Sequence, residues 1–444
     1  MFESITHTRM TRWGAWLLGL LFTASVAAQS SDSLDWGDDE SWGDDPWASE
    51  DQTWQWYGFV EGAWAERINN DPLIDSDQTL AESRLQLETE RAFEDYTVSA
   101  KADFWADGVE DNAQADLRAL HLDTTLGESI DLRAGRQVLT WGTGDLVFLN
   151  DLFPKDYTAF FSGRHDEYLK APSDAIKLSW YGDLTVDAVW MPRANPNRFI
   201  TGERLSSFSP RQGRRVAAPP KLDPLERDAL IDDSEFALRL YQNINGTEWA
   251  GYAYKGYDKQ PSAYDSQRDR TYFPALEVLG ASVRRTGFGG IINAETAYHF
   301  GADHAGDDPN QPNSQWRFLA GYEHEPATNL TLGWQYYLQW TQEHEALIES
   351  LPDAQKPFAT DEYRHVVTNR LTWQVLRQDL TLSMFTFFSP SDADYYLRPR
   401  AEYRFSDQLT GSVGGNVFGG EDDWTFYSQL ENNSNLYARL RYQF

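Results

Sequence analysis

Two stretches near the end of the chain carry arginine on one side of a strand. The first, "DYYLRPRAEYRF", contains Arg398, Arg400 and Arg404, and the second, "NLYARLRYQF", contains Arg439 and Arg441. Residues two apart in a β-strand point to the same face, so each stretch predicts a row of guanidinium groups. In a water-filled bore, such a row of fixed positive charges favours anions over cations.

The same sorting by face assigns further charges to the inside of the predicted sheet. The arginines predicted to line a pore are Arg84, Arg118, Arg133, Arg239, Arg317, Arg398, Arg400, Arg404, Arg439 and Arg441. The other bases on these faces are Lys101, Lys177, Arg364 and Arg370. The acids on these faces are Glu82, Glu88, Glu90, Asp103, Asp116, Asp131, Glu295, Glu323 and Glu402. We therefore predict a net basic wall, although the formal net charge of the chain is -31. The alternative is that these arginines pair with neighbouring acids and fill the lumen.

Strands with one apolar and one polar face must position these charges. The apolar face of the last segment consists of Leu436, Ala438, Leu440, Tyr442 and Phe444. The same alternation recurs in residues 80–91, 173–182, 184–190, 329–340 and 394–405. The chain contains 18 Trp and 22 Tyr, and yet its mean hydropathy is only -0.60. Many aromatic residues with low mean hydropathy are typical of a membrane barrel, whose strands face lipid on one side and water on the other.

Short turns alternate with long polar loops along the chain. Turns at residues 181–183, 243–246 and 406–408 are separated by loops such as 192–233. This asymmetry is typical of outer-membrane barrels, and we predict an all-β fold for residues 54–444: a closed, transmembrane antiparallel β-barrel of about 18 strands with long extracellular loops. Unpaired backbone groups are costly in lipid, so the last strand should pair with the first. The predicted location is the bacterial outer membrane.

The alternation breaks in two places. Leu120 is out of phase in "RALHLD", and Asn369 falls on the outward face of residues 362–373. We expect a β-bulge or a different strand boundary at both positions.

The residues before the barrel divide into two parts. Residues 1–28 have a basic start, an apolar run and a small-residue exit, which predict a secretory signal peptide. Residues 29–53 are rich in acids and lack bases, so we predict a disordered periplasmic lead-in. Its Trp36, Trp42 and Trp47 are predicted to bind a periplasmic partner, with a plain linker as the alternative. The chain contains no cysteine, which excludes disulfides and thiolate metal sites.

Two loops can narrow the predicted pore. Loop 192–233 is predicted to fold inward as a constriction, or alternatively to lie outside against lipopolysaccharide phosphates. The arginines predicted to form this constriction are Arg204, Arg211, Arg214 and Arg215. Loop 142–171 contains "LVFLNDLFPKDYTAFF", which is too apolar for an exposed loop. We predict that it packs on the inner wall or at the barrel mouth as a plug.

The sequence predicts no enzyme, cofactor or metal centre. It contains no G-x-S-x-G, H-E-x-x-H or Walker motif. His299 and His304 lie near Asp303 at a spacing that matches no metal class, and a surface Ca²⁺ there is a minor alternative. An outward Ser–His pair that includes His365 is another. The expected partners are outer-membrane lipid, lipopolysaccharide and the outer-membrane assembly machinery, and nucleic acid is not among them.

Two longer stretches resemble a known family. "LRAGRQVLTWGTGDLVFLNDLFPKDY" and "NVFGGEDDWTFYSQLENNSNLYARLRYQF" look like outer-membrane porins of the alginate-export type and their poorly characterised relatives. The resemblance implies a barrel of about 18 strands and a transport function, without specifying the cargo. The terminal Phe444 also resembles the C-terminal signal read by the outer-membrane assembly machinery. Some relatives work beside inner-membrane exporters of hydrophobic compounds.

We therefore expect a porin-like channel for the passage or export of anionic solutes. The alternative is a plugged barrel that serves as the partner-binding component of a trans-envelope exporter of hydrophobic or polymeric cargo. Such a component would require a periplasmic or inner-membrane exporter as its partner.

Overall fold

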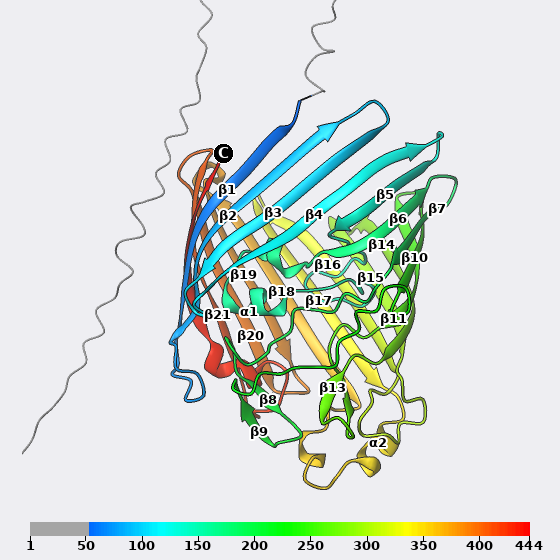
Figure 1. Ribbon diagram of the computed structural model, residues 1–444, viewed down its shortest axis with the longest axis vertical. Helices are drawn as coiled ribbons and strands as arrows, with labels where there is room; N and C mark the ends of the chain where they lie inside the picture. The colour runs from blue at the N-terminus through cyan, green and yellow to red at the C-terminus, as the bar shows by residue number, and fades with distance from the viewer. Residues whose placement is uncertain (1–52) are drawn as a thin grey trace, which may run out of the picture. The chain divides into compact units, whose positions relative to one another are not determined.

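The barrel is a single sheet of 18 strands that closes on itself, in a computed structural model that describes residues 53–444 (Figure 1). All neighbouring strands are antiparallel, and β1 (Gln55–Arg67) pairs with both β2 (Gln78–Ala92) and β22 (Asn435–Gln443). The prediction of a closed all-β barrel of this size is confirmed. The predicted signal peptide and almost all of the predicted lead-in lie outside the described residues.

The remaining elements follow in chain order. The other barrel strands are β3 (Tyr96–Asp107), β4 (Asn112–Leu126), β5 (Ile130–Gln137), β6 (Ser173–Trp180), β7 (Thr185–Met191), β10 (Glu235–Ile244), β11 (Thr247–Tyr257), β14 (Ala275–Gly287), β15 (Gly290–Phe300), β16 (Gln315–Ala327), β17 (Leu330–Thr341), β18 (Tyr363–Val375), β19 (Leu380–Ser389), β20 (Asp394–Arg404) and β21 (Leu409–Gly420). Two loop hairpins consist of β8 (Ser207–Ser209) with β9 (Arg214–Val216), and β12 (Ala263–Asp265) with β13 (Arg270–Tyr272). The helices are α1 (Tyr157–Ser162) and α2 (His344–Ser350), and the 3₁₀ turns are η2 (Asp166–Leu169), η3 (Lys356–Phe358), η4 (Leu376–Gln378) and η5 (Ser428–Asn433). No helix within residues 53–444 is long and apolar enough to cross a membrane.

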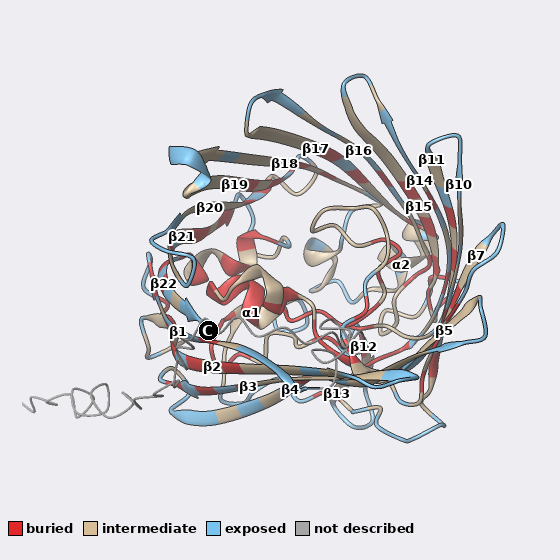
Figure 2. Cartoon of the chain, turned by 90° about the horizontal axis from the view of Figure 1, so that it is seen from above, coloured by how far each residue is buried: buried red, intermediate tan, exposed pale blue. Residues whose placement is uncertain are grey.

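The two faces of each strand meet different surroundings. In β22 the side chains of Leu436 and Leu440 are 59% and 52% exposed, whereas Tyr437 and Arg439 are buried. Asn435 on the buried side of β22 donates to the Phe161 carbonyl of α1 (Tyr157–Ser162) at 3.0 Å, and α1 lies inside the ring of strands (Figure 2), so the buried side of β22 is the inner side. The exposed aromatic residues of the outer surface include Trp56, Trp64, Trp180, Trp249, Trp334 and Tyr442. This apolar exterior is the surface that lipid solvates in a membrane barrel.

The first and last strands close the ring. Their register runs from Phe59 opposite Gln443 to Arg67 opposite Asn435. Beyond the last ladder pair, the Gly58 amide donates to the Phe444 carbonyl at 3.0 Å, and the Phe444 amide donates to the Gly58 carbonyl at 3.0 Å. The closed ring leaves no sheet edge, as a lipid-exposed sheet requires.

The connections at the two ends of the barrel differ in length. Turns 245–246 and 288–289 are two residues long, whereas loops 138–172 and 192–234 are the longest connections between barrel strands. Because the strand number is even, the barrel begins and ends on the same side. Figure 1 shows that this is the side of the short turns. In outer-membrane barrels this side is periplasmic, and the long loops are extracellular.

Of the two expected irregularities, one is a β-bulge. The β3–β4 register shifts between Lys101 and Ala102, which face Ala119 and Leu117, and this bulge explains the broken alternation at Leu120. At Asn369 the expected bulge is absent, because β18 pairs without a shift on both sides, and the strand boundary is different, since β18 ends at Val375 and not at residue 373. The side-chain amide of Asn369 donates to the Gly333 carbonyl of β17 at 3.1 Å, so this polar side chain on the outer face has a hydrogen-bond partner.

Gly135→Ala should destabilise the barrel by about 1–3 kcal/mol, since Gly135 has a φ of 127° and a Cβ there would collide with the Leu120 carbonyl oxygen. The heat-modifiable band shift on semi-native gels should then occur at a lower temperature. Gly62→Ala is the matched control, because Gly62 is also in a strand but a Cβ there would have no heavy atom within 4 Å. An equal shift in both variants would contradict this account.

Candidate functional site

The internal loop (residues 138–172), which connects β5 to β6, enters the lumen. It carries α1 and η2, and α1 lies inside the ring of strands (Figure 2). The Asp156 carboxylate caps α1 by accepting a hydrogen bond from the Ala159 amide at 2.7 Å. The prediction that this apolar loop packs against the inner wall is confirmed.

Apolar side chains of the internal loop contact much of the inner wall. Leu149, Phe153, Phe160 and Phe161 are almost fully buried, and the ring centroid of Phe161 lies 5.7 Å from that of Tyr396 on β20. The wall residues of the same cluster include Val189, Ala237, Val278, Ala297, Leu319, Tyr337, Val366, Phe385, Phe387, Tyr396 and Phe418. Burial of one large apolar side chain stabilises a fold by on the order of 2 kcal/mol, so the internal loop is a packed part of the structure.

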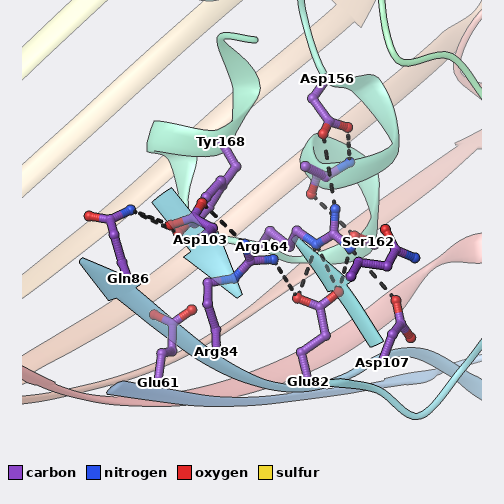
Figure 3. Close-up of polar contacts among 12 residues, drawn as sticks. Glu61, Glu82, Arg84, Gln86, Asp103, Asp107, Asp156, Ser162, Arg164 and Tyr168 are labelled. Atoms are coloured by element: carbon purple, nitrogen blue, oxygen red, sulfur yellow. Dashed lines mark hydrogen bonds and ion pairs between the residues drawn. The ribbon is translucent and has the colours of Figure 1, made fainter. Parts of the chain in front are cut away.

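A buried ion-pair cluster, the Glu82 anchor, holds the internal loop at β2 and β3. The Arg164 guanidinium binds Glu82 through Nε at 2.9 Å and through Nη2, and it lies 3.8 Å from Asp107 and 4.0 Å from Asp156 (Figure 3). The Glu82 side chain is only 2% exposed. Removing one partner of such a buried pair leaves an uncompensated charge, which costs about 3–5 kcal/mol.

Arg84 joins this anchor to η2. Its guanidinium binds Glu82 at 2.9 Å and Asp103 at 3.3 Å. The guanidinium carbon also lies 4.4 Å from the ring centroids of Trp105 and of Tyr168. Tyr168 belongs to the internal loop and Trp105 to β3, so one cation links loop and wall through their aromatic rings. Figure 3 shows Tyr168 beside Arg84.

Carboxylates of the internal loop bind arginines on β20 and β22. Asp166 accepts from Arg398 at 2.6 Å and lies 3.4 Å from Arg400. Glu167 lies 2.7 Å from Arg441. This second attachment is the Asp166 anchor.

A third attachment, the Asp145 anchor, fixes the start of the internal loop at β15, β17 and β18. Arg370 donates to Asp145 at 2.8 Å, and the Asp145 amide donates to Gln335 at 2.7 Å. Glu295 accepts from the Gly144 amide at 2.7 Å. The internal loop is therefore attached at separate points around the lumen.

Two neighbouring residues of the internal loop, His165 and Asp166, differ in protonation at neutral pH. Burial opposes ionisation of Asp166, but the two β20 arginines outweigh it and hold its pKa well below the usual value. Burial, together with Arg441 and Arg439, lowers the pKa of His165 to about 4. At neutral pH, Asp166 is therefore charged and His165 is neutral.

Most of the predicted pore-lining arginines form ion pairs with carboxylates, namely Arg84, Arg133, Arg239, Arg398, Arg400, Arg404 and Arg441. The other three bind uncharged acceptors among residues 53–444. Arg118 donates to backbone carbonyls of the internal loop, Arg439 to the Ser412 hydroxyl at 3.1 Å, and Arg317 to the Gln315 side chain at 2.7 Å. For most of the set, the geometry favours the alternative that the arginines pair with acids and fill the lumen.

The expected excess of bases on the inner wall does not hold once the register is known. Further acids that contact inner partners are Glu61, Asp107, Asp123, Asp187, Glu235, Glu248 and Asp394. Sequence patterns missed them because several lie at strand ends, where alternation is hard to assign. Acids and bases on the inner wall are therefore close to balance.

The charges are instead separated around the ring. The basic arc (β18–β22) carries the inner bases Arg364, Arg370, Arg398, Arg400, Arg404, Arg439 and Arg441, and the inner acids Asp394 and Glu402. The acidic arc (β1–β4) carries Glu61, Glu82, Glu88, Glu90, Asp103, Asp107, Asp116 and Asp123 against Arg67, Arg84, Lys101 and Arg118. The internal loop matches this pattern, because its carboxylates bind the basic arc and Arg164 binds the acidic arc.

The long loop (residues 192–234) also reaches the inner wall. The buried Arg204 side chain donates to the Thr79 carbonyl at 2.9 Å and binds Asp107. The Arg204 carbonyl accepts from Arg67 at 2.6 Å. This part of the loop therefore folds inward, as the predicted constriction requires.

The other three arginines of the predicted constriction lie elsewhere. Arg215 pairs with Asp423 at 2.9 Å, and the guanidinium of the exposed Arg211 lies 3.3 Å from the Tyr264 ring centroid. Arg214 is exposed. The structure thus brings one of the four to the barrel wall.

The remaining sequence candidates are not gathered in one place. His299 Nε2 lies 3.2 Å from the Leu149 carbonyl inside the barrel, while His365 Nδ1 lies 2.8 Å from the Tyr336 hydroxyl on the outer face. In the described part of the chain, no group of three or more metal-binding side chains is arranged to hold an ion. Outside the described residues lie the predicted partner-binding tryptophans, Trp36, Trp42 and Trp47.

Sequence patterns missed a cavity of about 610 Å³ between the internal loop and the wall. Its lining includes Arg317, Gln339 and Arg364, which the register places side by side on β16, β17 and β18. The available signal was a polar residue on the inner face of three successive strands. Without the register, these positions cannot be aligned.

Comparisons with known proteins agree with this architecture. Residues 110–444 match the family model described as "Protein of unknown function (DUF1302)". A search of curated proteins finds no match to the chain.

Several solved outer-membrane porins share the fold. OccAB3 of Acinetobacter baumannii is 10% identical, with 88% of this chain and 99% of that chain covered and a TM-score of 0.52. OccAB1 of the same organism is 10% identical, with 88% and 96% covered and a TM-score of 0.51. OccK11 of Pseudomonas aeruginosa is 10% identical, with 88% and 96% covered and a TM-score of 0.50. The shared fold and the apolar exterior confirm a β-barrel of the kind that outer-membrane porins have.

Glu82→Gln should loosen the internal loop, because a neutral amide leaves Arg164 and Arg84 short of a counter-charge, at a cost of about 3–5 kcal/mol. Single-channel recordings should show a higher open probability than in the wild type, while semi-native gels still show a folded barrel. Glu277→Gln is the matched control, since it removes an exposed pair with Lys255 at 2.7 Å. Equal open probabilities in all three proteins would contradict the anchoring role.

Acidification should release the internal loop between about pH 6.5 and pH 4. A displaced His165 regains a pKa of about 6.5, so the displaced state binds a proton in this window and the docked state does not. Docking is therefore fully favoured above this window and is weakened as pH falls through it. Open probability measured against pH should rise on acidification, and His165→Asn should flatten the curve. The groups that face the imidazole are Asp166, Glu167, Arg439 and Arg441. An unchanged curve in the variant would assign the response to another group.

Proposed function

Since the chain belongs to the DUF1302 family, whose description names no activity, we propose a function from the lumen itself. The protein is an outer-membrane channel for anionic solutes that the internal loop keeps closed at rest. One observation carries this proposal. Carboxylates of the chain itself occupy the guanidinium groups of the basic arc.

These carboxylates stand where solute anions would bind. Asp166 occupies Arg398 and Arg400, and Glu167 occupies Arg441. When the internal loop withdraws, Arg398 and Arg400 on β20 lose their carboxylate partner, whereas Arg441 on β22 keeps Glu61 at 2.8 Å. The Debye length is about 8 Å at physiological salt, so fixed positive charge on one side of a narrow aqueous path is felt across much of the width of that path. An anion in the path is therefore stabilised.

A second function is supported by the filled lumen and the largely apolar lining of the cavity. In this reading, the barrel is the partner-binding component of a trans-envelope exporter of hydrophobic or polymeric cargo. Its partner would be periplasmic or in the inner membrane, and Trp36, Trp42 and Trp47 would dock it. The alginate-export type suggested by the sequence resemblance remains a prediction within the wider porin-like fold.

Reversal potentials in planar bilayers test the anionic channel. The wild type should prefer anions, and Arg439→Glu should weaken this preference. Arg439 suits the test because it donates to the Ser412 hydroxyl and makes no ion pair with a carboxylate of the internal loop, although its charge faces His165. Its replacement therefore changes the charge of the path without removing an ion pair from an anchor.

Arg285→Glu makes the same charge change at an exposed position, where the side chain donates to the Thr286 carbonyl at 3.3 Å. Its selectivity should remain that of the wild type. Cation preference in the wild type would refute the anionic channel. If even Glu82→Gln fails to conduct, the exporter component is favoured.

A further inference from the structure

The cavity beside the internal loop has the size of a small-molecule site. Its volume is about 610 Å³, and the internal loop, the inner wall and the extracellular loops 192–234 and 421–434 all contribute to its lining. Ligand pockets commonly measure about 300–1,000 Å³ and combine apolar walls with a few placed polar groups. Both features are present here.

The polar side of the cavity is a row across three strands. Arg317 on β16 is opposite Gln339 on β17, and Gln339 is opposite Arg364 on β18. Adjacent strands are about 4.8 Å apart, so the backbones of the two arginines lie about 10 Å apart. All three side chains line the cavity.

Arg317 and Arg364 have guanidinium N–H groups that the protein does not fully occupy. Among the described residues, Arg317 makes no ion pair with a carboxylate, and it donates to Gln315. Arg364 donates through Nε to Asp392 at 2.6 Å, while its Nη2 is buried and lacks a hydrogen-bond partner. A buried donor without an acceptor is costly, and an anion in the cavity would satisfy it once the side chains that cover Nη2 shift aside.

The other bases that line the cavity are already neutralised. Lys155 lies 3.0 Å from Asp151, and Lys259 lies 2.6 Å from Glu235. Arg364 also pairs with a carboxylate, Asp392, so within residues 53–444 Arg317 on β16 is the lining arginine or lysine without one, while Asp258 adds a negative charge to the same lining.

The remaining walls are mostly apolar. Two residues along each strand toward the periplasm, Tyr337 and Val366 replace Gln339 and Arg364, and Phe387 continues this surface on β19. Leu146 and Phe148 of the internal loop also line the cavity. The site is thus amphipathic, with its charged row toward the extracellular side.

We propose that this cavity binds an amphipathic organic anion, with its anionic group on Arg317 and Arg364 and its apolar body against Tyr337, Val366 and the internal loop. This inference deepens and rests on the proposed function, because such an anion is the substrate class that the channel would admit. Inorganic phosphate would leave the apolar walls empty, and a neutral hydrocarbon would leave the Arg364 donor unsatisfied.

The test measures binding without current. The full-length protein in lipid nanodiscs is titrated into 6-fluoro-2-naphthoate, and the ¹⁹F line width reports binding relative to empty nanodiscs. Arg317→Gln/Arg364→Gln should weaken binding about tenfold or more. The matched control is Arg268→Gln/Arg285→Gln, which removes two exposed charges outside the cavity and should bind as the wild type does. The neutral analogue 6-fluoro-2-naphthalenemethanol should bind more weakly and should not distinguish the variants.

Val366→Trp fills the apolar side and should abolish binding in a barrel that semi-native gels still show as folded. Equal affinity in the wild type and the arginine double variant would overturn the proposal. If phosphatidate in the nanodisc displaces naphthoate, Arg317 and Arg364 bind a lipid head group. That result would overturn the proposal that the cavity binds a small organic anion. A protein that binds naphthoate but does not conduct would refute the channel and keep the site, whereas a conducting protein that does not bind would do the reverse.

Discussion

Lipid offers no hydrogen bonds to a polypeptide backbone, and the rest of the structure depends on this constraint. A sheet in the membrane must close, and here β1 and β22 complete the ring through their paired backbones. A ring of 18 strands encloses more space than wall side chains can fill, and barrels of 16–18 strands typically leave an aqueous channel. In this protein the chain itself enters that space. Closure thus creates the lumen, and the apolar character of the internal loop follows from the need to pack it.

The contacts of the internal loop show how a polar lumen accepts a folded segment. Burying a charge is costly unless a partner of opposite sign is already fixed in place. The wall supplies such partners on separate arcs, with Glu82 facing Arg164 and Arg398 facing Asp166. Apolar packing around Phe161 holds the middle of the loop between them. The segment is therefore specified by charge sign as well as by shape.

Strand faces could be predicted from the sequence because alternation depends only on neighbouring residues. It placed Arg398, Arg400, Arg439 and Arg441 on one side of their strands, and their contacts lie inside the barrel. Register and long-range contact could not be predicted in this way.

The candidate site depends on that second kind of information. The row across β16, β17 and β18 exists because β17 hydrogen-bonds to both neighbours at one particular register. Likewise, 232 residues separate Asp166 from Arg398, and no periodic pattern joins them. The predicted excess of bases on the inner wall was wrong for the same reason. Acids such as Glu61 can be assigned to the inner wall only from the side chains that they contact.

The internal loop is continuous with β5 at Gln137 and with β6 at Ser173, so both of its ends stay fixed to the wall when the rest of the loop moves. Between these tethers, its three anchors bind different strands and share no side chain. The ion pairs of one anchor can therefore break while those of the other two remain formed. An opening lumen therefore widens in discrete steps, and the current through a single barrel should visit sub-conductance levels between closed and fully open.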